Sequence, residues 1–106
     1  MKDLKCPVEL LFKVIGQRWS AYILWLLQSQ GPIRFGELKR KIPGISQKVL
    51  TEKLRELEQA KLINRDYKPT IPPTVIYSVT SHSEELGSIL KDLSVLAYTW
   101  REKGLL

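Results

Sequence analysis

Apolar residues recur at three- and four-residue intervals along most of the chain, which is the pattern of helices with one buried side. Residues 7–16 predict a first helix that starts at Pro7 and stops at Gly16. Its apolar positions are Val8, Leu11, Phe12 and Ile15. Residues 19–28 predict a second helix that is apolar on more than one side, so we expect it to be central.

Shorter segments separated by turn residues follow the second helix. Residues 35–41 predict a short helix, and Pro43-Gly44 breaks it. Ser46 is a good N-cap for a longer helix over residues 47–60. The inward side of that helix carries Leu50, Leu54 and Leu57, and its opposite side carries Lys48, Thr51, Glu52 and Arg55.

The rest of the chain predicts two strands and a final helix. Residues 62–67 and 75–79 have strand-like patterns, and the proline-rich residues 68–74 between them predict a hairpin with a stiff tip. Ser81-x-x-Glu84 has the form of a capping box that opens a helix running to about Arg101. The apolar side of this helix carries Leu86, Ile89, Leu90, Leu93, Leu96, Ala97 and Trp100.

This order of elements predicts the fold class. It is mainly α with a small β-hairpin (α+β), arranged as a winged helix-turn-helix in a single domain over residues 1–106. The helix-turn-helix would cover about residues 35–60, the wing about 62–79 and the C-terminal helix about 82–101. Because the major groove of DNA, about 12 Å wide, admits one helix, helix 47–60 is the candidate for reading double-stranded DNA.

The distribution of charge favours the same interpretation. The net charge is +6, which points toward an acidic partner such as nucleic acid. Between Arg34 and Arg55 there are seven positive and two negative residues, so this segment alone carries +5. A charged run by itself favours a solvated face that keeps the protein soluble, and it is the combination with the helix order that favours DNA.

Individual roles in DNA binding follow from side-chain chemistry. Phosphate contacts are predicted for Arg34, Lys39 and Lys41, and for Ser46 at a helix N-terminus. Base-edge contacts are predicted for Gln47, Lys48 and Thr51, while Arg55 could reach bases or phosphate. Lys68 and Thr70 would contact phosphate from the wing. We expect Glu52 to pair with Arg55 or Lys48 rather than read a cytosine.

Rare residue types exclude several other classes of protein. With one Cys and one His, a single chain can form neither a disulfide nor a Cys/His zinc site, and no phosphate-binding glycine motif occurs, so no metal or cofactor is expected. His82 and its serine neighbours lie at a helix start and do not form a catalytic relay, so no catalytic residue is predicted and the chain is not expected to be an enzyme. The longest apolar runs are too short to cross a membrane, and no signal peptide opens the chain, so we expect a cytoplasmic protein.

An ordered set of short motifs resembles the HxlR-type winged-helix transcriptional regulators, which are relatives of the MarR-type regulators. The set spans roughly residues 6–100. It comprises Cys6-Pro7, Gly16-x-x-Trp19, Arg34-Phe35-x-x-Leu38, Gly44-Ile45-Ser46, Leu50-x-x-x-Leu54-x-x-Leu57, Ile63-x-Arg65, Pro72-Pro73-x-x-x-Tyr77-x-x-Thr80 and Trp100. The chain departs from the family pattern at Gln17, Lys61 and Ser83, where glycine is usual, which puts local turn geometry in doubt but not the fold.

The resemblance implies a homodimer that binds an inverted-repeat operator, with both chain ends forming the dimer interface. The final helix is consistent with a homodimer, because its apolar residues extend over more of its circumference than one small domain can cover. The candidate interface residues are Val8, Leu11, Leu86, Ile89, Leu90, Leu93, Leu96 and Trp100.

Cys6 is the candidate switch. It lies at a probable helix N-cap next to Lys5 and near Lys2, and a helix N-terminus and nearby cations favour the reactive thiolate. The resemblance implies sensing of a small electrophile or oxidant at this position, by direct modification or by a disulfide between subunits. The alternative is that Cys6 is a small apolar residue at the interface.

Two alternatives to a thiol-switched DNA-binding regulator remain at this stage. A winged-helix protein–protein module without DNA binding would require an apolar outer face on helix 47–60, which is not found. A regulator switched by a small aromatic effector would require a pocket, for which the place between Trp19, Tyr22 and the final helix is the candidate.

Overall fold

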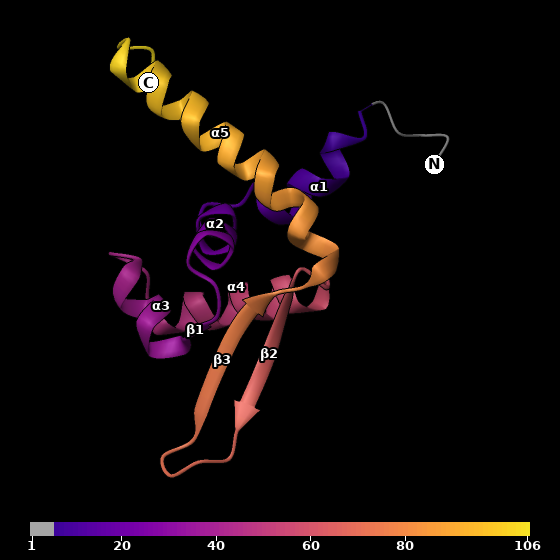
Figure 1. Ribbon diagram of the computed structural model, residues 1–106, viewed down its shortest axis with the longest axis vertical. Helices are drawn as coiled ribbons and strands as arrows, with labels where there is room; N and C mark the ends of the chain where they lie inside the picture. The colour runs from indigo at the N-terminus through magenta and orange to yellow at the C-terminus, as the bar shows by residue number, and fades with distance from the viewer. Residues whose placement is uncertain (1–5) are drawn as a thin grey trace.

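The computed structural model describes residues 6–106 and has the architecture of a winged helix-turn-helix (Figure 1). A helical body carries a β-hairpin at one end and a long C-terminal helix at the other. In chain order the elements are α1 (Val8–Ile15), α2 (Ser20–Gln30), β1 (Ile33–Arg34), α3 (Phe35–Lys41), α4 (Gln47–Gln59), β2 (Ile63–Lys68), β3 (Thr74–Val79), a short 3₁₀ turn (Ser81–Ser83) and α5 (Glu84–Glu102). The predicted class, mainly helical with a small sheet, is confirmed.

Helix α2 is at the centre of the body, as its pattern predicted. It contacts α1, α4, α5 and strand β3, and Figure 1 shows it between α5 and α4. Buried residues lie on more than one side of it, namely Ser20, Ile23, Leu24, Leu26 and Leu27. The other helices therefore take their positions from their contacts with α2.

Helix α4 is fixed at both ends by backbone and side-chain hydrogen bonds. The Ser46 hydroxyl oxygen accepts from the Val49 N–H at 3.1 Å, which confirms the predicted N-cap. At the other end Lys61 adopts a φ of 62°, in the left-handed region that favours glycine. The Leu62 N–H then reaches the Leu57 carbonyl at 3.0 Å, and the helix ends as it would with glycine. Although Lys61 stands where the family usually has glycine, the turn keeps the usual geometry, and Lys61 takes up the backbone strain.

The sheet has one strand more than the sequence predicted. The expected hairpin is present as β2 and β3, but β1 also pairs with β3, so the order is β1-β3-β2 with all pairs antiparallel. Strand β1 aligns Ile33 with Tyr77 and Arg34 with Ile76. Two residues are too few to show alternation, so this strand leaves no periodic signal in the sequence.

The predicted capping box at the start of the last helix is wrong by one residue. The residue that caps is Thr80, whose hydroxyl oxygen accepts from the Ser83 N–H at 3.1 Å and whose next three residues form a 3₁₀ turn. Ser83 is buried, and its hydroxyl donates to the Leu62 carbonyl at 2.7 Å. Serine therefore replaces the expected glycine because its side chain ties the start of α5 to the chain just after α4.

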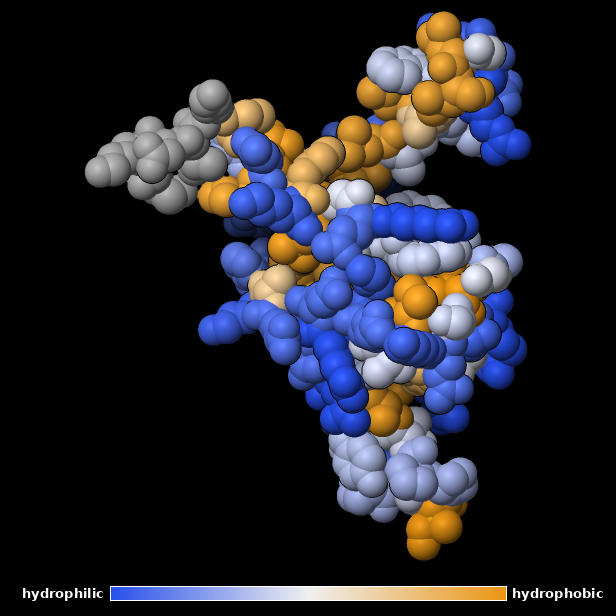
Figure 2. Space-filling model, turned by 180° about the vertical axis from the view of Figure 1, so that it is seen from behind, coloured by the Kyte–Doolittle hydropathy of each residue, from blue (hydrophilic) through white to orange (hydrophobic). Residues whose placement is uncertain are grey.

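Helix α5 has two unlike halves. In the first half Leu86 and Leu90 are buried in the core of their own chain, so they are not available to a partner as predicted. Gly87 lets α2 approach closely, because a Cβ there would lie 2.6 Å from the Gln28 side chain. The second half projects from the body in Figure 1, and from the opposite side Figure 2 shows hydrophobic surface along it.

Candidate nucleic-acid interface

Helices α3 and α4 and the β2–β3 hairpin lie together, at the end of the molecule away from the tip of α5 (Figure 1). The inner side of α4 is closed by three buried leucines, Leu50, Leu54 and Leu57. Its outer side is polar: Gln47, Lys48, Glu52 and Arg55 are exposed, and Thr51 is half-buried. The structure therefore brings the predicted base-reading residues to one solvent-facing side of one helix.

The two hydroxyls of α4 have different hydrogen-bonding capacity left for DNA. Ser46 uses its oxygen as an acceptor for the Val49 N–H, so its hydrogen is available to donate to a phosphate. Thr51 instead donates to the Gln47 carbonyl at 2.8 Å. Thr51 can consequently offer a base edge only its acceptor lone pair and its methyl group.

Ion pairing separates the seven positive residues between Arg34 and Arg55 into two groups. Arg40 pairs with Glu37 on α3, and Lys53 pairs with Glu56 on α4 at 3.4 Å. The remaining five form no ion pair within residues 6–106, and they are Arg34, Lys39, Lys41, Lys48 and Arg55. Within this segment, they are the positive residues for which the sequence predicts DNA contacts.

The expected pairing of Glu52 is wrong. Among the described residues Glu52 forms no ion pair, either with Lys48 or with Arg55. Its carboxylate is exposed on the outer side of α4. It can therefore repel phosphate or accept from a cytosine amino group.

A groove of about 450 Å³ separates α4 from the sheet. Its walls carry two guanidinium groups, one from Arg55 on α4 and one from Arg65 on β2. The Arg65 guanidinium lies over the Tyr67 ring, 5.8 Å from its centroid, which restricts its orientation. Arg65 is a further candidate for a DNA contact that the sequence did not single out. The available signal was its cationic, outward position on a strand next to the helix-turn-helix.

The wing uses part of its predicted binding chemistry internally. Lys68 pairs with Asp66 at 3.1 Å, and the Thr70 hydroxyl donates to the Pro72 carbonyl at 2.8 Å. Both side chains remain exposed. Ile71 at the tip is fully exposed, and Figure 2 shows hydrophobic surface there. The tip thus offers DNA an apolar side chain that the sequence reading did not single out.

The place predicted for an effector, between Trp19, Tyr22 and the final helix, does not coincide with the cavity that lies between α2 and α5. Trp19 packs against the core with Arg18 over its ring, and the Tyr22 hydroxyl donates to the Lys41 carbonyl at 3.4 Å. The cavity between α2 and α5 is beside Trp25 instead and has a volume of about 580 Å³. Its α5 wall includes Gly87 and Lys91.

Cys6 is exposed and precedes α1. The N-cap position is occupied by Pro7 rather than Cys6, and the Cys6 carbonyl accepts from the Glu9 N–H at 3.0 Å. The predicted cationic neighbours Lys2 and Lys5 lie outside the described residues.

Two negative findings apply to residues 6–106. No three side chains of His, Cys, Asp or Glu come together there in a way that could hold a metal ion. None of the helices in that range combines the length and the apolar character needed to cross a membrane.

The fold, the polar outer side of α4 and the unpaired cations of α3 and α4 together define a winged helix-turn-helix DNA-binding transcriptional regulator. Residues 14–104 match the family model described as HxlR-like helix-turn-helix. The chain belongs to this family, whose members are transcriptional regulators and not enzymes. The resemblance stated from the sequence motifs is confirmed.

Individual relatives agree over nearly the whole chain. The HTH-type transcriptional regulator YodB of Bacillus subtilis (strain 168) is 37% identical over 105 residues, which cover 98% of this chain and 93% of YodB. The solved structure of the redox regulator HypR in its reduced form has a TM-score of 0.85 and 33% identity, covering 91% of this chain and 94% of HypR. The crystal structure of diamide-treated YodB has a TM-score of 0.70 and 34% identity, covering 94% and 95% of the two chains.

Proposed function

We propose that this chain acts as a homodimer that binds an inverted-repeat operator, with α4 of each subunit in a major groove. The observation that carries the proposal is a set of five cations without ion pairs in the described helix-turn-helix: Lys48 and Arg55 on the outer side of α4, Lys39 and Lys41 on α3, and Arg34 just before α3. Lys48 and Arg55 would contact the groove, while Arg34, Lys39 and Lys41 would hold phosphates. A protein–protein module would need an apolar outer side on α4.

The homodimer is supported by apolar surface at the two ends of the chain. Large side chains on α1 and on the outer half of α5 are exposed by 38% or more, a degree of exposure that favours an interaction site. The proposed interface residues are Val8, Leu11, Ile89, Leu93, Leu96 and Trp100. A twofold dimer built on them would read two half-sites related by the same symmetry and spaced by whole helical turns.

Selection of bound duplexes from a random pool tests DNA binding, specificity and symmetry together. We expect enrichment of an inverted repeat. Binding of the selected duplex should weaken steeply with salt, because several phosphate contacts release counterions. Failure to enrich any duplex, or an affinity independent of salt, would contradict the proposal.

The same proposal includes a thiol switch at Cys6. Its support is the exposure of Cys6 next to α1, together with the relatives described as a redox regulator and as diamide-treated. Diamide would accept two hydrogens from two thiols, and an S–S bond would form between the Cys6 residues of two subunits. Diamide should then weaken operator binding of the wild type and leave Cys6→Ser unaffected; equal responses would exclude the switch.

The cavity beside Trp25 supports a second candidate switch, a small aromatic effector. The ring would lie against Trp25, and an anionic substituent would reach Lys91. Benzoate is a suitable probe. It should quench the Trp fluorescence of the wild type, and a Ser88→Leu variant, whose larger side chain narrows the cavity from an exposed position, should lose that response.

A further inference from the structure

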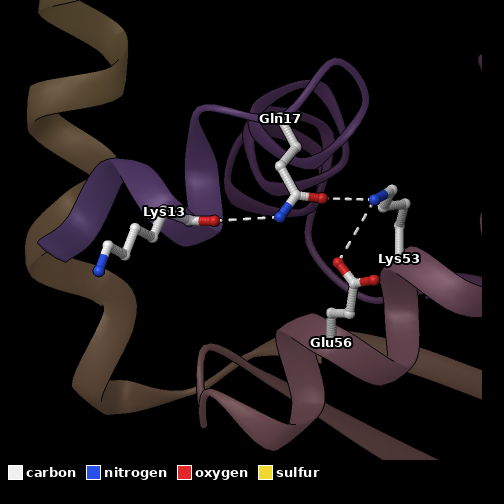
Figure 3. Close-up of polar contacts among 4 residues, drawn as sticks. All are labelled: Lys13, Gln17, Lys53 and Glu56. Atoms are coloured by element: carbon white, nitrogen blue, oxygen red, sulfur yellow. Dashed lines mark hydrogen bonds and ion pairs between the residues drawn. The ribbon is translucent and has the colours of Figure 1, made fainter. Parts of the chain in front are cut away.

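We propose that Gln17 is a positioning residue that transmits movement of α1 to the DNA-reading helix α4. This inference rests on the proposed function in two respects, namely that α4 reads DNA and that α1 borders the partner subunit. The structural basis is a chain of polar contacts that joins Lys13, Gln17, Lys53 and Glu56 across the α1–α2 turn (Figure 3).

The first contact arises because α1 ends before the Lys13 carbonyl obtains a backbone partner. A continued helix would give that carbonyl the N–H of residue 17, but the chain turns after Gly16. The Gln17 side chain takes its place, with Nε2 donating to the Lys13 carbonyl oxygen at 3.0 Å. The Gln17 amide is thereby attached to the last turn of α1.

The second contact uses the other end of the same amide. Gln17 Oε1 accepts from Lys53 Nζ on α4, which lies 36 positions further along the chain. The orientation of the amide is determined by its partners, because a carbonyl oxygen accepts and an ammonium group donates. One planar group therefore connects the end of α1 to the middle of α4, and neither contact can change without displacing the other.

The Lys53 side chain is positioned for this role rather than for DNA. It is only 19% exposed, and its ammonium group also pairs with Glu56 at 3.4 Å. Lys48 and Arg55, by comparison, are exposed and without ion pairs in the described chain. The Lys53–Glu56 pair lies within α4, whereas the contact of Lys53 with Gln17 leaves the helix, so the network bears on the placement of α4.

Few other contacts connect α1 to the rest of the molecule. Ile15 is its one buried residue, and Val14 packs against the core from the same turn. Both lie at the end of α1 that Gln17 caps, while residues 8–13 leave apolar side chains exposed. A change at the exposed end of α1 can therefore reach α4 through this turn. A glycine at position 17 would make neither bond.

The test compares variants of the full-length protein by two independent readouts. The first is the set of backbone amide resonances of Lys48, Thr51 and Arg55, measured by NMR without DNA. The second is affinity for the duplex selected from the random pool. Gln17→Ala should shift those resonances and weaken operator binding roughly three- to tenfold, which is the range that one hydrogen bond supplies. Gln30→Ala, an exposed glutamine at the end of α2, is the matched control and should do neither.

A double-mutant cycle isolates the contact itself. Lys53→Met removes the donor and keeps the aliphatic stem, and Lys103→Met controls for the loss of one positive charge. Gln17→Ala and Lys53→Met should be non-additive, so that the double variant binds no more weakly than the weaker single variant. Gln17→Glu keeps an acceptor for Lys53 but loses the donor to Lys13, so it detaches the side chain from α1 and should still shift the α4 resonances.

The outcomes separate this inference from the proposed function. If the wild type binds the duplex and Gln17→Ala matches Gln30→Ala in both readouts, the role of Gln17 is overturned and DNA binding stands. If no duplex is bound, the proposed function fails, and the amide resonances still decide whether Gln17 positions α4. Additive effects in the cycle would likewise overturn the proposed contact.

Discussion

Helices α4 and α5 are both amphipathic, but they stand in opposite relations to the rest of the chain. Helix α4 buries all three of its inward leucines and exposes polar residues. Helix α5 is longer, at 19 residues, yet it buries only Leu86 and Leu90 and leaves large apolar residues exposed beyond them. The apolar side of α4 is covered within one chain, whereas most of the apolar side of α5 is left exposed by it.

This difference explains why similar patterns lead to different functions. A helix whose apolar side is already covered presents its polar side to solvent, where it can meet an anionic partner. A helix whose apolar side is uncovered favours association with another apolar surface. Substitutions in the two helices should accordingly change different measurable quantities.

The largest expected effect is loss of core packing in α4. Leu54→Ala should lower the free energy of unfolding by about 2–5 kcal/mol, because it leaves a cavity at a position that is 1% exposed. Denaturant unfolding should show this loss at every protein concentration. The same change on α5, Leu93→Ala, should have an effect that varies with protein concentration, since it acts on association. A concentration-independent loss at Leu93 would contradict the contrast between the helices.

The next effect is on self-association. Trp100→Ala should raise the dimer dissociation constant by about 30-fold or more, because a half-buried Trp at an interface is a typical energetic centre. Analytical ultracentrifugation measures this directly. The control is Tyr67→Ala, which removes a similarly exposed aromatic ring from the wing (50% against 43%). Equal dimer dissociation constants for the two variants would show that α5 is not part of the interface.

A smaller effect is expected on DNA affinity from the outer side of α4. Arg55→Ala should weaken binding of the selected duplex by about 1–3 kcal/mol and leave the dimer intact. Lys103→Ala removes the same charge just beyond α5 and should bind almost as the wild type does. Titration of labelled duplex at fixed salt compares them. Equal losses would mean that only net charge matters.

The smallest effect concerns the cap of α4. Ser46→Ala should reduce stability by about 1 kcal/mol, because it leaves the Val49 N–H without its acceptor. Ser94→Ala on α5 is the comparison, since the Ser94 hydroxyl only donates to the Lys91 carbonyl within the helix. Thermal unfolding distinguishes them. A larger loss at Ser94 would show that the first turn of α4 does not depend on its cap.

Most of the fold followed from local signals in the sequence. Helix periodicity placed the α4 leucines, and Ser46 marked its start within a residue. The features that escaped prediction all depend on contacts between distant residues. Strand β1 forms because Ile33 pairs with Tyr77 of β3. The cap lies at Thr80 rather than Ser81, next to Ser83, whose hydroxyl donates to the Leu62 carbonyl.

The candidate site shows the same limit. Residue type and helix position sufficed to nominate the five cations between Arg34 and Arg55 that form no ion pair in the described chain. The groove that brings Arg65 toward Arg55 depends on how the wing packs on the helix, which no local pattern records. For the same reason too many residues of α5 were predicted at the interface. Leu86, Leu90 and Leu93 lie on one side of the helix, but only Leu86 and Leu90 are buried against the body of their own chain.

The pairing of β1 with β3 has a consequence for how binding sites can diverge. Arg34 ends β1 and is also the residue from which α3 starts, so the strand joins the wing to the helix-turn-helix directly. Backbone pairing therefore holds the wing to the helix-turn-helix, and under the proposed function the two would read one half-site together. In the proposed homodimer, a change in operator spacing would then arise in the dimer geometry, and a change in half-site sequence would arise on α4 or the wing. Spacing and sequence preference can thus be altered separately, by substitutions at opposite ends of the molecule.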